Sequence, residues 1–335
     1  MSTLGFSLAG PLRVWAVTDG RAGIENQALG LAEAIARRTA SEIIVKRVGL
    51  RTPYAWLPSG MVPAPRQALS AGSDPIAPPW PDIWIGCGRR SIPFSMGVRG
   101  WSRGRTLVVQ LQDPRVNPRE FDIVAAPTHD GLEGANIINM IGACHRVTPA
   151  RVAAARDEYP IALDDLPSPR YAVLIGGKSK RQDISAARAQ TIAEQLARLQ
   201  ALTGGALMTS LSRRTGEAAR LQLAARLAPL SALYYDGEGP NPYFAMLGAA
   251  DAVIVTADSV NMAAEAASTG KPIHVLAVDG TGGKLDRFHA SLAARGCARG
   301  FKLPLAHWSY TPLNETDRIA AAVLTALRAR LGAGN

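Results

Sequence analysis

Two adjacent glycines followed by a cluster of cations form the first candidate site in the sequence. The turn IGGKSKR places Gly176 and Gly177 directly before Lys178, Lys180 and Arg181. Glycines let a backbone approach a diphosphate closely, and the cations offset its charge. The turn is not a P-loop, because GxxxxGK[ST] does not fit it. We predict that Gly176, Gly177 and Lys178 contact a phosphate-bearing ligand. A solvated basic turn is the alternative.

A second candidate turn, TADSVNMAAE, contains residues that could begin a helix and bind a ribose. Asp258 or Ser259 could cap the helix that Val260 begins, and a capping role alone is the alternative. Glu265 follows the cap on the same helix, where its carboxylate could accept hydrogen bonds from both hydroxyls of a ribose. This turn and the glycine turn fall in the same domain. We therefore expect the glycine turn to bind one nucleoside diphosphate together with Asp258, Ser259, Val260 and Glu265.

A third junction, TSLSRRT, lies between an expected strand at 206–209 and an expected helix at 213–227. Its Thr209, Ser210 and Arg213 could cap the helix or clamp a phosphate, and both interpretations stay open. We count these three residues among the expected contacts of the same ligand.

The first turn of the chain, TDGRAGIENQ, offers a candidate base beside a candidate anion site. Gly20 and Gly23 permit a tight turn, and the amides at a helix start attract anions. Asp19, at the end of the first expected strand, could take a proton from an acceptor hydroxyl. The alternative is structural: Asp19 caps the helix, and Asn26 and Gln27 stabilise the turn.

His129 is the second candidate base, and a hydrogen-bonded loop pair with Asp130 is the alternative. The five histidines show no HxxxH or Cys-His spacing, so we expect no zinc site. No GxSxG motif occurs, which argues against a serine hydrolase of the α/β type.

The positive charge of the chain is concentrated in one segment. Among 335 residues, 37 Lys and Arg exceed 27 Asp and Glu, for a net charge of +10. The stretch 89–119 holds seven arginines and one acid, which accounts for +6 of that total. A nucleic-acid binder would spread its cations along a face with aromatic residues between them, so we expect an anion or lipid-headgroup patch that includes Arg89 and Arg90.

The same segment has an amphipathic pattern. Apolar residues interleave with its arginines, as in a helix that lies against anionic lipid. A core-facing helix with solvated arginines is the alternative.

The pattern of the whole chain predicts an α/β fold with two Rossmann-like domains facing each other across a cleft. Apolar, β-branched runs alternate with Ala-rich helical periods, which is typical of parallel sheets, and the pattern restarts near residue 170. Among these runs we expect strands at 107–111 and, as the last strand of the second sheet, at 272–277. We expect an N-terminal acceptor domain at 1–160, a nucleotide-sugar-binding domain at 161–310, and a last helix within 311–335 that packs back on the first domain. The Pro-rich residues 51–81 are expected to form an irregular insertion.

Cysteine usage and hydropathy predict the compartment. Cys87, Cys144 and Cys297 are too few for a disulfide scaffold in a chain of this length, which indicates a reducing environment. The sequence shows no signal-peptide pattern and no apolar run long enough to span a membrane. We expect a cytoplasmic protein, with peripheral contact to the inner membrane as a further hypothesis.

The longer motifs resemble the mitochondrial fission ELM (elongated mitochondria) family of bacteria and plants. The resemblance rests on TDGRAGIENQALGLAEAI, PDIWIGCGRRS, VVQLQDPR, FDIVAAPTHD and VIVTADSVNMAAEAASTGKPIHV, and it covers about residues 13–302. That family is in turn similar to GT-B glycosyltransferases, most visibly the peptidoglycan enzyme that adds N-acetylglucosamine to a lipid-linked acceptor.

The resemblance implies roles for individual residues. Gly176, Gly177 and Lys178 occupy the place of the turn that meets the donor diphosphate in such enzymes, and Glu265 occupies that of the ribose-binding glutamate. Near the position of the catalytic histidine of the peptidoglycan enzyme this chain has Ile24. Asp19 and His129 therefore remain as the candidate bases.

Together these features predict a metal-independent glycosyltransferase without a cofactor. Its donor would be a UDP- or GDP-linked sugar, and its acceptor a lipid-linked or polyanionic molecule of the cell envelope. Two alternatives stay open. One is a non-catalytic adaptor on a GT-B scaffold that associates with membranes or division proteins, as the division role of the plant member suggests. The other is a nucleotide-sugar 2-epimerase.

Overall fold

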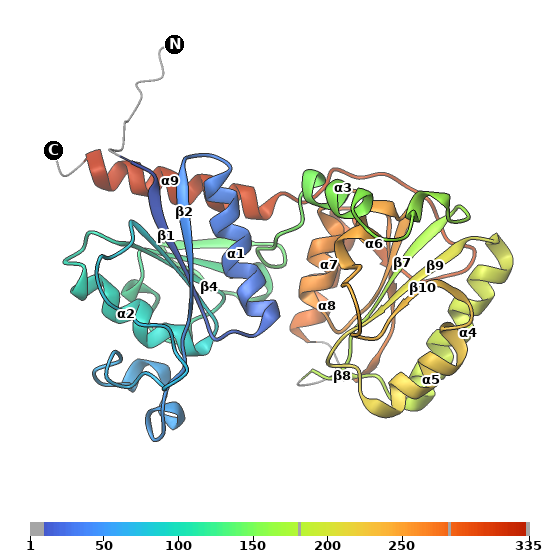
Figure 1. Ribbon diagram of the computed structural model, residues 1–335, viewed down its shortest axis with the longest axis horizontal. Helices are drawn as coiled ribbons and strands as arrows, with labels where there is room; N and C mark the ends of the chain where they lie inside the picture. Colours follow the sequence, from blue (N-terminus) through green and yellow to red (C-terminus); the bar gives the residue numbers. More distant parts are fainter. Residues whose placement is uncertain (1–9, 180–181, 281–282, 333–335) are drawn as a thin grey trace, which may run out of the picture. The chain divides into compact units, whose positions relative to one another are not determined.

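Two compact α/β units make up the part of the chain that the computed structural model describes, residues 10–179, 182–280 and 283–332 (Figure 1). One unit extends to Arg146 and resumes at Asn314, and the other comprises Val147–Leu313. Each unit contains a six-stranded parallel sheet with helices on its faces. The prediction of two Rossmann-like domains is confirmed.

The sheet of the N-terminal unit has the strand order β2-β1-β3-β4-β5-β6. Its elements are β1 (Leu12–Thr18), α1 (Ala22–Ala36), β2 (Ser41–Arg47), β3 (Ile83–Cys87), α2 (Ile92–Trp101), β4 (Leu107–Leu111), β5 (Ile123–Pro127), β6 (Ile137–Met140) and α9 (Glu315–Gly332). The chain places β2 on one side of β1 and then β3 on the other. The strand order therefore reverses between β1 and β3, and such switch points are where open α/β sheets bind ligands.

Helices α1 and α9 pack on one face of this sheet, and α2 covers the other (Figure 1). Side chains alternate along a strand, so Val14 of β1 packs toward α1 whereas Trp15 packs toward α2. Helix α9 follows the second unit in the chain yet belongs to the first unit. Its apolar side shares the core of α1, and its Arg330 pairs with Asp122 (Nη2 to Oδ1, 2.5 Å).

The sheet of the C-terminal unit has the order β10-β9-β7-β11-β12-β14. Its elements are α3 (Pro149–Asp157), β7 (Arg170–Ile175), α4 (Ala186–Thr203), β9 (Ala206–Leu211), α5 (Glu217–Leu227), β10 (Ser231–Tyr235), α6 (Tyr243–Ala249), β11 (Ala252–Thr256), α7 (Val260–Ala267), β12 (Ile273–Leu276), α8 (Lys284–Ala294) and β14 (Ala298–Gly300), with an antiparallel pair of β8 (Gln182–Asp183) and β13 (Asp279–Gly280). Helices α4 and α5 pack side by side on one face, with Leu196 and Leu223 in the core. Here the strand order reverses between β7 and β11.

The structure corrects two boundaries of the predicted fold. The first unit ends at Arg146 and not at residue 160, because α3 packs against α6 of the second unit. Gly248 of α6 allows that close approach, since a Cβ there would lie 2.3 Å from the carbonyl oxygen of Val152. The second sheet also extends one strand beyond the expected last strand at 272–277, because β14 pairs with β12.

Candidate functional site

The two adjacent glycines lie at the centre of the carboxyl edge of the second sheet. They follow β7, between the turns that follow β9 and β11. A Cβ on Gly176 would lie 2.1 Å from Oδ2 of Asp258, and one on Gly177 would lie 2.1 Å from the carbonyl oxygen of Arg214. The two glycines therefore make room for the neighbouring turns of the protein itself, and contact with a phosphate-bearing ligand stays a prediction.

The carboxylate of Asp258 holds the glycine turn in place through hydrogen bonds. Its side chain is 0% exposed, and its carboxylate accepts hydrogen bonds from the Gly177 amide (2.9 Å), the Thr256 hydroxyl (2.7 Å) and Nη2 of Arg214 (2.9 Å). Arg214 also donates to the carbonyl oxygens of Gly177 and Lys178. Asp258 therefore positions the turn, and its oxygens face the protein.

The amides of the glycine turn are used within the protein. The Gly176 amide donates to Oγ1 of Thr256 (2.8 Å), the Gly177 amide to Asp258, and the Lys178 amide to the carbonyl oxygen of Arg214 (3.0 Å). A ligand at this edge would therefore meet side chains and a helix end before it met these amides.

Positive charge is nevertheless exposed at this edge. The side chains of Lys178 and Arg213 are exposed, and neither makes a hydrogen bond or an ion pair with another described residue. Lys180 and Arg181 lie outside the described residues. Helix α7 begins here, with Ser259 as its cap (Met262 amide to Oγ, 3.3 Å). Helix N-termini favour negative charge, so this edge can attract an anion.

Glu265 lies on α7 and is paired with Tyr243, the first residue of α6. The Tyr243 hydroxyl donates a hydrogen bond to Oε2 of Glu265, and the glutamate is 8% exposed. Burial raises the pKa of the Glu265 carboxyl to about 7, although the hydrogen bond from Tyr243 lowers it. Burial also raises the pKa of Tyr243. No described residue donates a hydrogen bond to Oε1 of Glu265, so that oxygen can accept one from a ligand.

The remaining expected donor contacts lie deeper in the sheet. Strand β9 continues to Leu211, so Thr209 and Ser210 fall within the strand and are buried. The Thr209 hydroxyl lies 2.8 Å from the hydroxyl of Ser231 on β10 and joins the two strands. Of the three expected contacts at this junction, Arg213 alone is exposed.

Four residues at this edge were not predicted as site residues from the sequence: Arg214, Tyr243, Thr256 and His289. Nε2 of His289 donates to the carbonyl oxygen of Ala257 (2.8 Å) if the ring is neutral, and burial lowers the pKa of His289. Its Nδ1 is then a buried acceptor without a partner among the described residues. The candidate turns TSLSRRT and TADSVNMAAE contained Arg214 and Thr256, but no local pattern marked Tyr243 or His289.

In the N-terminal unit, the switch point between β1 and β3 brings Asp19, Ile24 and Gly88 together. Gly88 has a φ of +86°, and a Cβ there would lie 2.9 Å from Cγ2 of Ile24 and 3.2 Å from Oδ2 of Asp19. The Asp19 side chain is only 2% exposed, and Arg21 donates to it through Nε (2.9 Å) and Nη2 (2.5 Å). The exposed group of this turn is thus the Arg21 guanidinium, and a role for Asp19 as base stays a prediction.

The other residues of the first turn have mixed exposure. Gly20 and Gly23 are exposed, Asn26 is half-buried, and Gln27 is buried. Oε1 of Gln27 accepts a hydrogen bond from Nε2 of Gln112 (3.0 Å), which follows β4 with a φ of +68°. Gln27 thus joins α1 to the end of β4 inside the unit, which matches the structural alternative for this residue.

His129 is distant from Asp19 within the same sheet. It lies in the 3-10 helix Thr128–Asp130 after β5, three strand positions from β1. Neighbouring strands are about 4.8 Å apart, which separates the two strand ends by roughly 14 Å. The two candidate bases therefore cannot share one proton directly, and they remain alternatives.

The arginine-rich segment forms a charged surface over a buried apolar side. Phe94 and Val98 of α2 lie in the core, whereas Arg89 and Arg90, which follow Gly88, are exposed. The apolar residues of α2 therefore serve the core, which corrects the interpretation of a helix lying on lipid and favours the alternative. None of the described helices is long and apolar enough to cross a membrane.

The described residues contain no group of three or more His, Cys, Asp or Glu side chains that could hold a metal ion. All three cysteines are buried and unpaired.

The sequence comparisons identify a family and two relatives. Residues 22–327 match the family model described as mitochondrial fission ELM1. The mitochondrial fission protein ELM1 of Arabidopsis thaliana is 31% identical over 277 residues, which cover 75% of this chain and 65% of that protein. An uncharacterized protein of Rickettsia prowazekii is 25% identical over 356 residues, which cover 95% of this chain and 99% of that protein. The chain thus spans less than two thirds of the plant relative.

Solved structures share the fold at low sequence identity. The UDP-GlcNAc 2-epimerase of Methanocaldococcus jannaschii, solved with UDP-GlcNAc and UDP, has a TM-score of 0.52 and 11% identity, over 94% of this chain and 99% of that one. The MnaA–UDP co-structure of S. aureus has a TM-score of 0.53 and 14% identity, over 93% and 88%. The glycotransferase of kitacinnamycin has a TM-score of 0.50 and 14% identity, over 95% and 91%. These similarities show a fold of the GT-B type.

Proposed function

Because this chain belongs to the mitochondrial fission ELM1 family and has a GT-B fold, we propose that it binds a nucleotide-sugar in its C-terminal unit and transfers the sugar to an acceptor. The observation that carries the proposal is the carboxyl edge of the second sheet. There, exposed Lys178 and Arg213 and the start of α7 supply positive charge, and the buried carboxyl of Glu265 follows on α7.

The diphosphate and the ribose of the ligand each have a matching group at this edge. The diphosphate would meet Lys178, Arg213 and the α7 N-terminus, which attract negative charge. The ribose hydroxyls would donate to Glu265, whose orientation Tyr243 fixes. Two of the similar solved structures contain UDP, so UDP is the first nucleotide to test, followed by GDP.

The proposed reaction is a glycosyl transfer without a metal. An acceptor hydroxyl oxygen forms a bond to the anomeric carbon while the bond from that carbon to the diphosphate breaks. The hydroxyl proton passes to a base, for which Asp19 and His129 are the candidates. Positive charge at the leaving diphosphate stabilises the transition state, and Lys178 and the α7 N-terminus would supply it.

The acceptor would be anionic, as a lipid-linked or polyanionic molecule of the cell envelope is. At the carboxyl edge of the N-terminal unit, Arg21, Arg89 and Arg90 are exposed. They follow β1 and β3, which flank the switch point of that sheet. Phosphate groups of an acceptor would pair with these guanidinium groups. Contact with an anionic membrane would likewise use arginines and not the apolar side of α2.

One observation favours the second candidate function, a non-catalytic adaptor. All three amides of the glycine turn are occupied within the protein, so the turn keeps its shape without a ligand. An adaptor needs no nucleotide, and its cellular function would survive the loss of Lys178 and Glu265 but not charge reversal of the exposed Arg99, Arg103 and Arg105.

Calorimetric titration with UDP, GDP, CDP and dTDP tests the proposal. We expect one nucleotide to bind, with affinity reduced about tenfold or more in Lys178→Ala, since a charged hydrogen bond is lost. Lys302→Ala is the matched control, because Lys302 is an exposed lysine of the same unit. Absence of binding by all four nucleotides, or equal losses in both variants, would exclude the proposed donor site.

Product analysis then separates the enzymes of this fold. A 2-epimerase converts the donor sugar without a second substrate, whereas a glycosyltransferase needs an acceptor. Incubation of the protein with UDP-GlcNAc alone should therefore leave the sugar at its original configuration. Release of the 2-epimer would replace the transferase proposal with the epimerase.

A further inference from the structure

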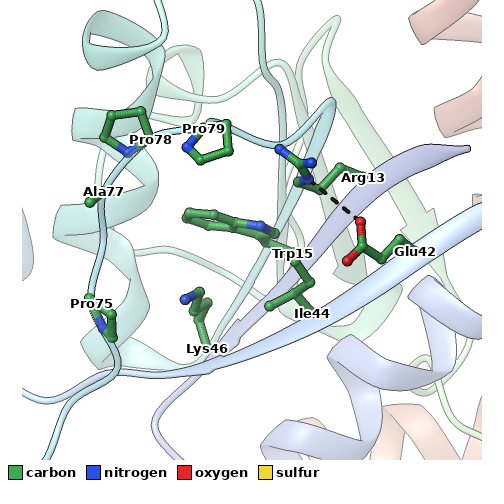
Figure 2. A pocket seen from close by; sticks show the side chains of 9 residues that line it. All are labelled: Arg13, Trp15, Glu42, Ile44, Lys46, Pro75, Ala77, Pro78 and Pro79. Atoms are coloured by element: carbon green, nitrogen blue, oxygen red, sulfur yellow. Dashed lines mark ion pairs between the residues drawn. The ribbon is translucent and has the colours of Figure 1, made fainter. Parts of the chain in front are cut away.

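A pocket of about 380 Å³ lies on the N-terminal unit, beside β1 and β2 (Figure 2). One side is formed by Trp15, Ile44 and Lys46 on the strands, and the other by the Pro-rich segment 75–79. Arg13 and Glu42 lie at one end. The volume is in the lower part of the range for small-ligand sites.

The Pro-rich segment is tied to the strands at both ends, which keeps the pocket open. The Asp74 amide donates to the carbonyl oxygen of Arg47 (2.8 Å), and the Arg47 amide donates to Oδ2 of Asp74 (2.6 Å). Beyond the segment, the Asp82 amide donates to the carbonyl oxygen of Arg13 (2.9 Å). Between these ties the chain passes over the sheet, and its prolines present apolar rings to Trp15 (Figure 2).

Trp15 contributes a hydrogen-bond donor that lacks an acceptor. The residue is 3% exposed, and its Nε1 is buried without a partner among the described residues. In Figure 2 this nitrogen lies at the end of the ring nearest Arg13 and Ile44. Buried donors nearly always have a partner, so an unpaired one in the wall of a pocket points to an acceptor atom of a ligand.

The charged groups of the pocket favour an anion. Nζ of Lys46 lies 5.0 Å from the Trp15 ring centroid and pairs with no carboxylate of the described chain. Arg13 pairs only loosely with Glu42, at 3.7 Å from Nε to Oε2, and the carboxylate of that pair is more than half exposed. The pocket thus combines two cations and one orphan donor with a single acid.

We propose that this pocket binds a small aromatic carboxylate, independently of the function proposed for the carboxyl edges of the sheets. The carboxylate accepts hydrogen bonds from the Lys46 ammonium and the Trp15 indole. The flat apolar body packs against the rings of Pro78 and Pro79 and the side chain of Ile44, which matches a planar ligand better than a branched one.

Titration of the full chain with 1-naphthaleneacetate tests the proposal, with the neutral 1-naphthaleneacetamide as the matched ligand. Two-dimensional NMR of the tryptophan indole N–H groups reports on Trp15, whose signal is identified by its absence in Trp15→Phe. We expect saturable binding of the acid that shifts the Trp15 signal, and at least tenfold weaker binding of the amide.

Substitutions locate the site. Lys46→Met should weaken binding of the acid about tenfold or more, since a charge-assisted hydrogen bond is lost, whereas Arg38→Met, an exposed cation of the same unit, should not. Both residues lie outside the core, so the comparison does not depend on Trp15→Phe folding well. Equal affinity for acid and amide, an unmoved Trp15 signal, or equal effects of the two substitutions would overturn the proposal. Calorimetry with UDP should give the same result for Lys46→Met as for the unsubstituted protein.

Discussion

The buried carboxyl of Glu265 should make the stability of this protein depend on pH in a range where ordinary glutamates are already ionised. Its pKa is about 7 in the folded chain, against 4.5 for an ordinary glutamate. The folded state therefore holds this proton more tightly than the unfolded state does. The resulting stabilisation is fully present below about pH 4.5 and is lost as the pH rises through 7.

The size of the effect follows from that shift. One pKa unit corresponds to about 1.4 kcal/mol, so the contribution of Glu265 to the free energy of unfolding should fall by about 3 kcal/mol between pH 4.5 and 8. In Glu265→Gln the side chain carries no ionisable proton but keeps an acceptor for the Tyr243 hydroxyl. Between pH 4.5 and 8, the free energy of unfolding of the variant should therefore rise by about 3 kcal/mol relative to that of the unsubstituted protein.

Urea denaturation at a series of pH values measures this difference. Because the two units can unfold separately, the relevant transition is the one that the substitution shifts. Glu158→Gln is the control, since Glu158 is exposed in the same unit and its side chain makes no hydrogen bond with another described residue. A stability difference for Glu265→Gln that stays constant from pH 4.5 to 8 would refute the reasoning.

Two further substitutions test the packing of the glycine turn, and one assay tests membrane binding. Gly176→Ala should lower the melting temperature strongly, because the new methyl would lie 2.1 Å from Asp258, whereas Gly216→Ala should not, since nothing lies within 4 Å of a Cβ there. Asp258→Ala should cost about 3 kcal/mol in urea denaturation, because two buried donors lose their acceptor; an unchanged midpoint would contradict the role of this carboxylate. Sedimentation with anionic liposomes should show binding that high salt abolishes, since Phe94 is in the core; salt-resistant binding would show apolar insertion.

Most of the parallel strands could be predicted because they are buried on both faces. Such strands appear as continuous apolar runs, and the run predicted at 107–111 coincides with β4. Helix α3 gave no comparable signal, because none of its residues is buried. The domain boundary was placed too late for the same reason, since α3 was not recognised as the first helix of the second unit.

Only those features of the candidate site that depend on residues close together in the sequence could be predicted. The pair Gly176 and Gly177 can be recognised in the sequence, but the reason why both positions require glycine cannot. It depends on Asp258, 81 residues from Gly177, and on Arg214, which only the tertiary structure brings to the same turn. Tyr243 was missed likewise, because its hydrogen bond to Glu265 spans 22 residues and two helices.

The internal use of the glycine-turn amides separates two kinds of recognition at this edge. A diphosphate would be held by exposed Lys178 and Arg213, and charges in water are screened by salt over about 8 Å at physiological ionic strength. The ribose would be held by the buried Glu265, which salt screens little but which loses its charge as the pH falls below about 7. Salt should therefore weaken the binding of UDP far more than that of uridine, whereas acidification should weaken the binding of both, because the two ligands share the ribose and differ in the diphosphate.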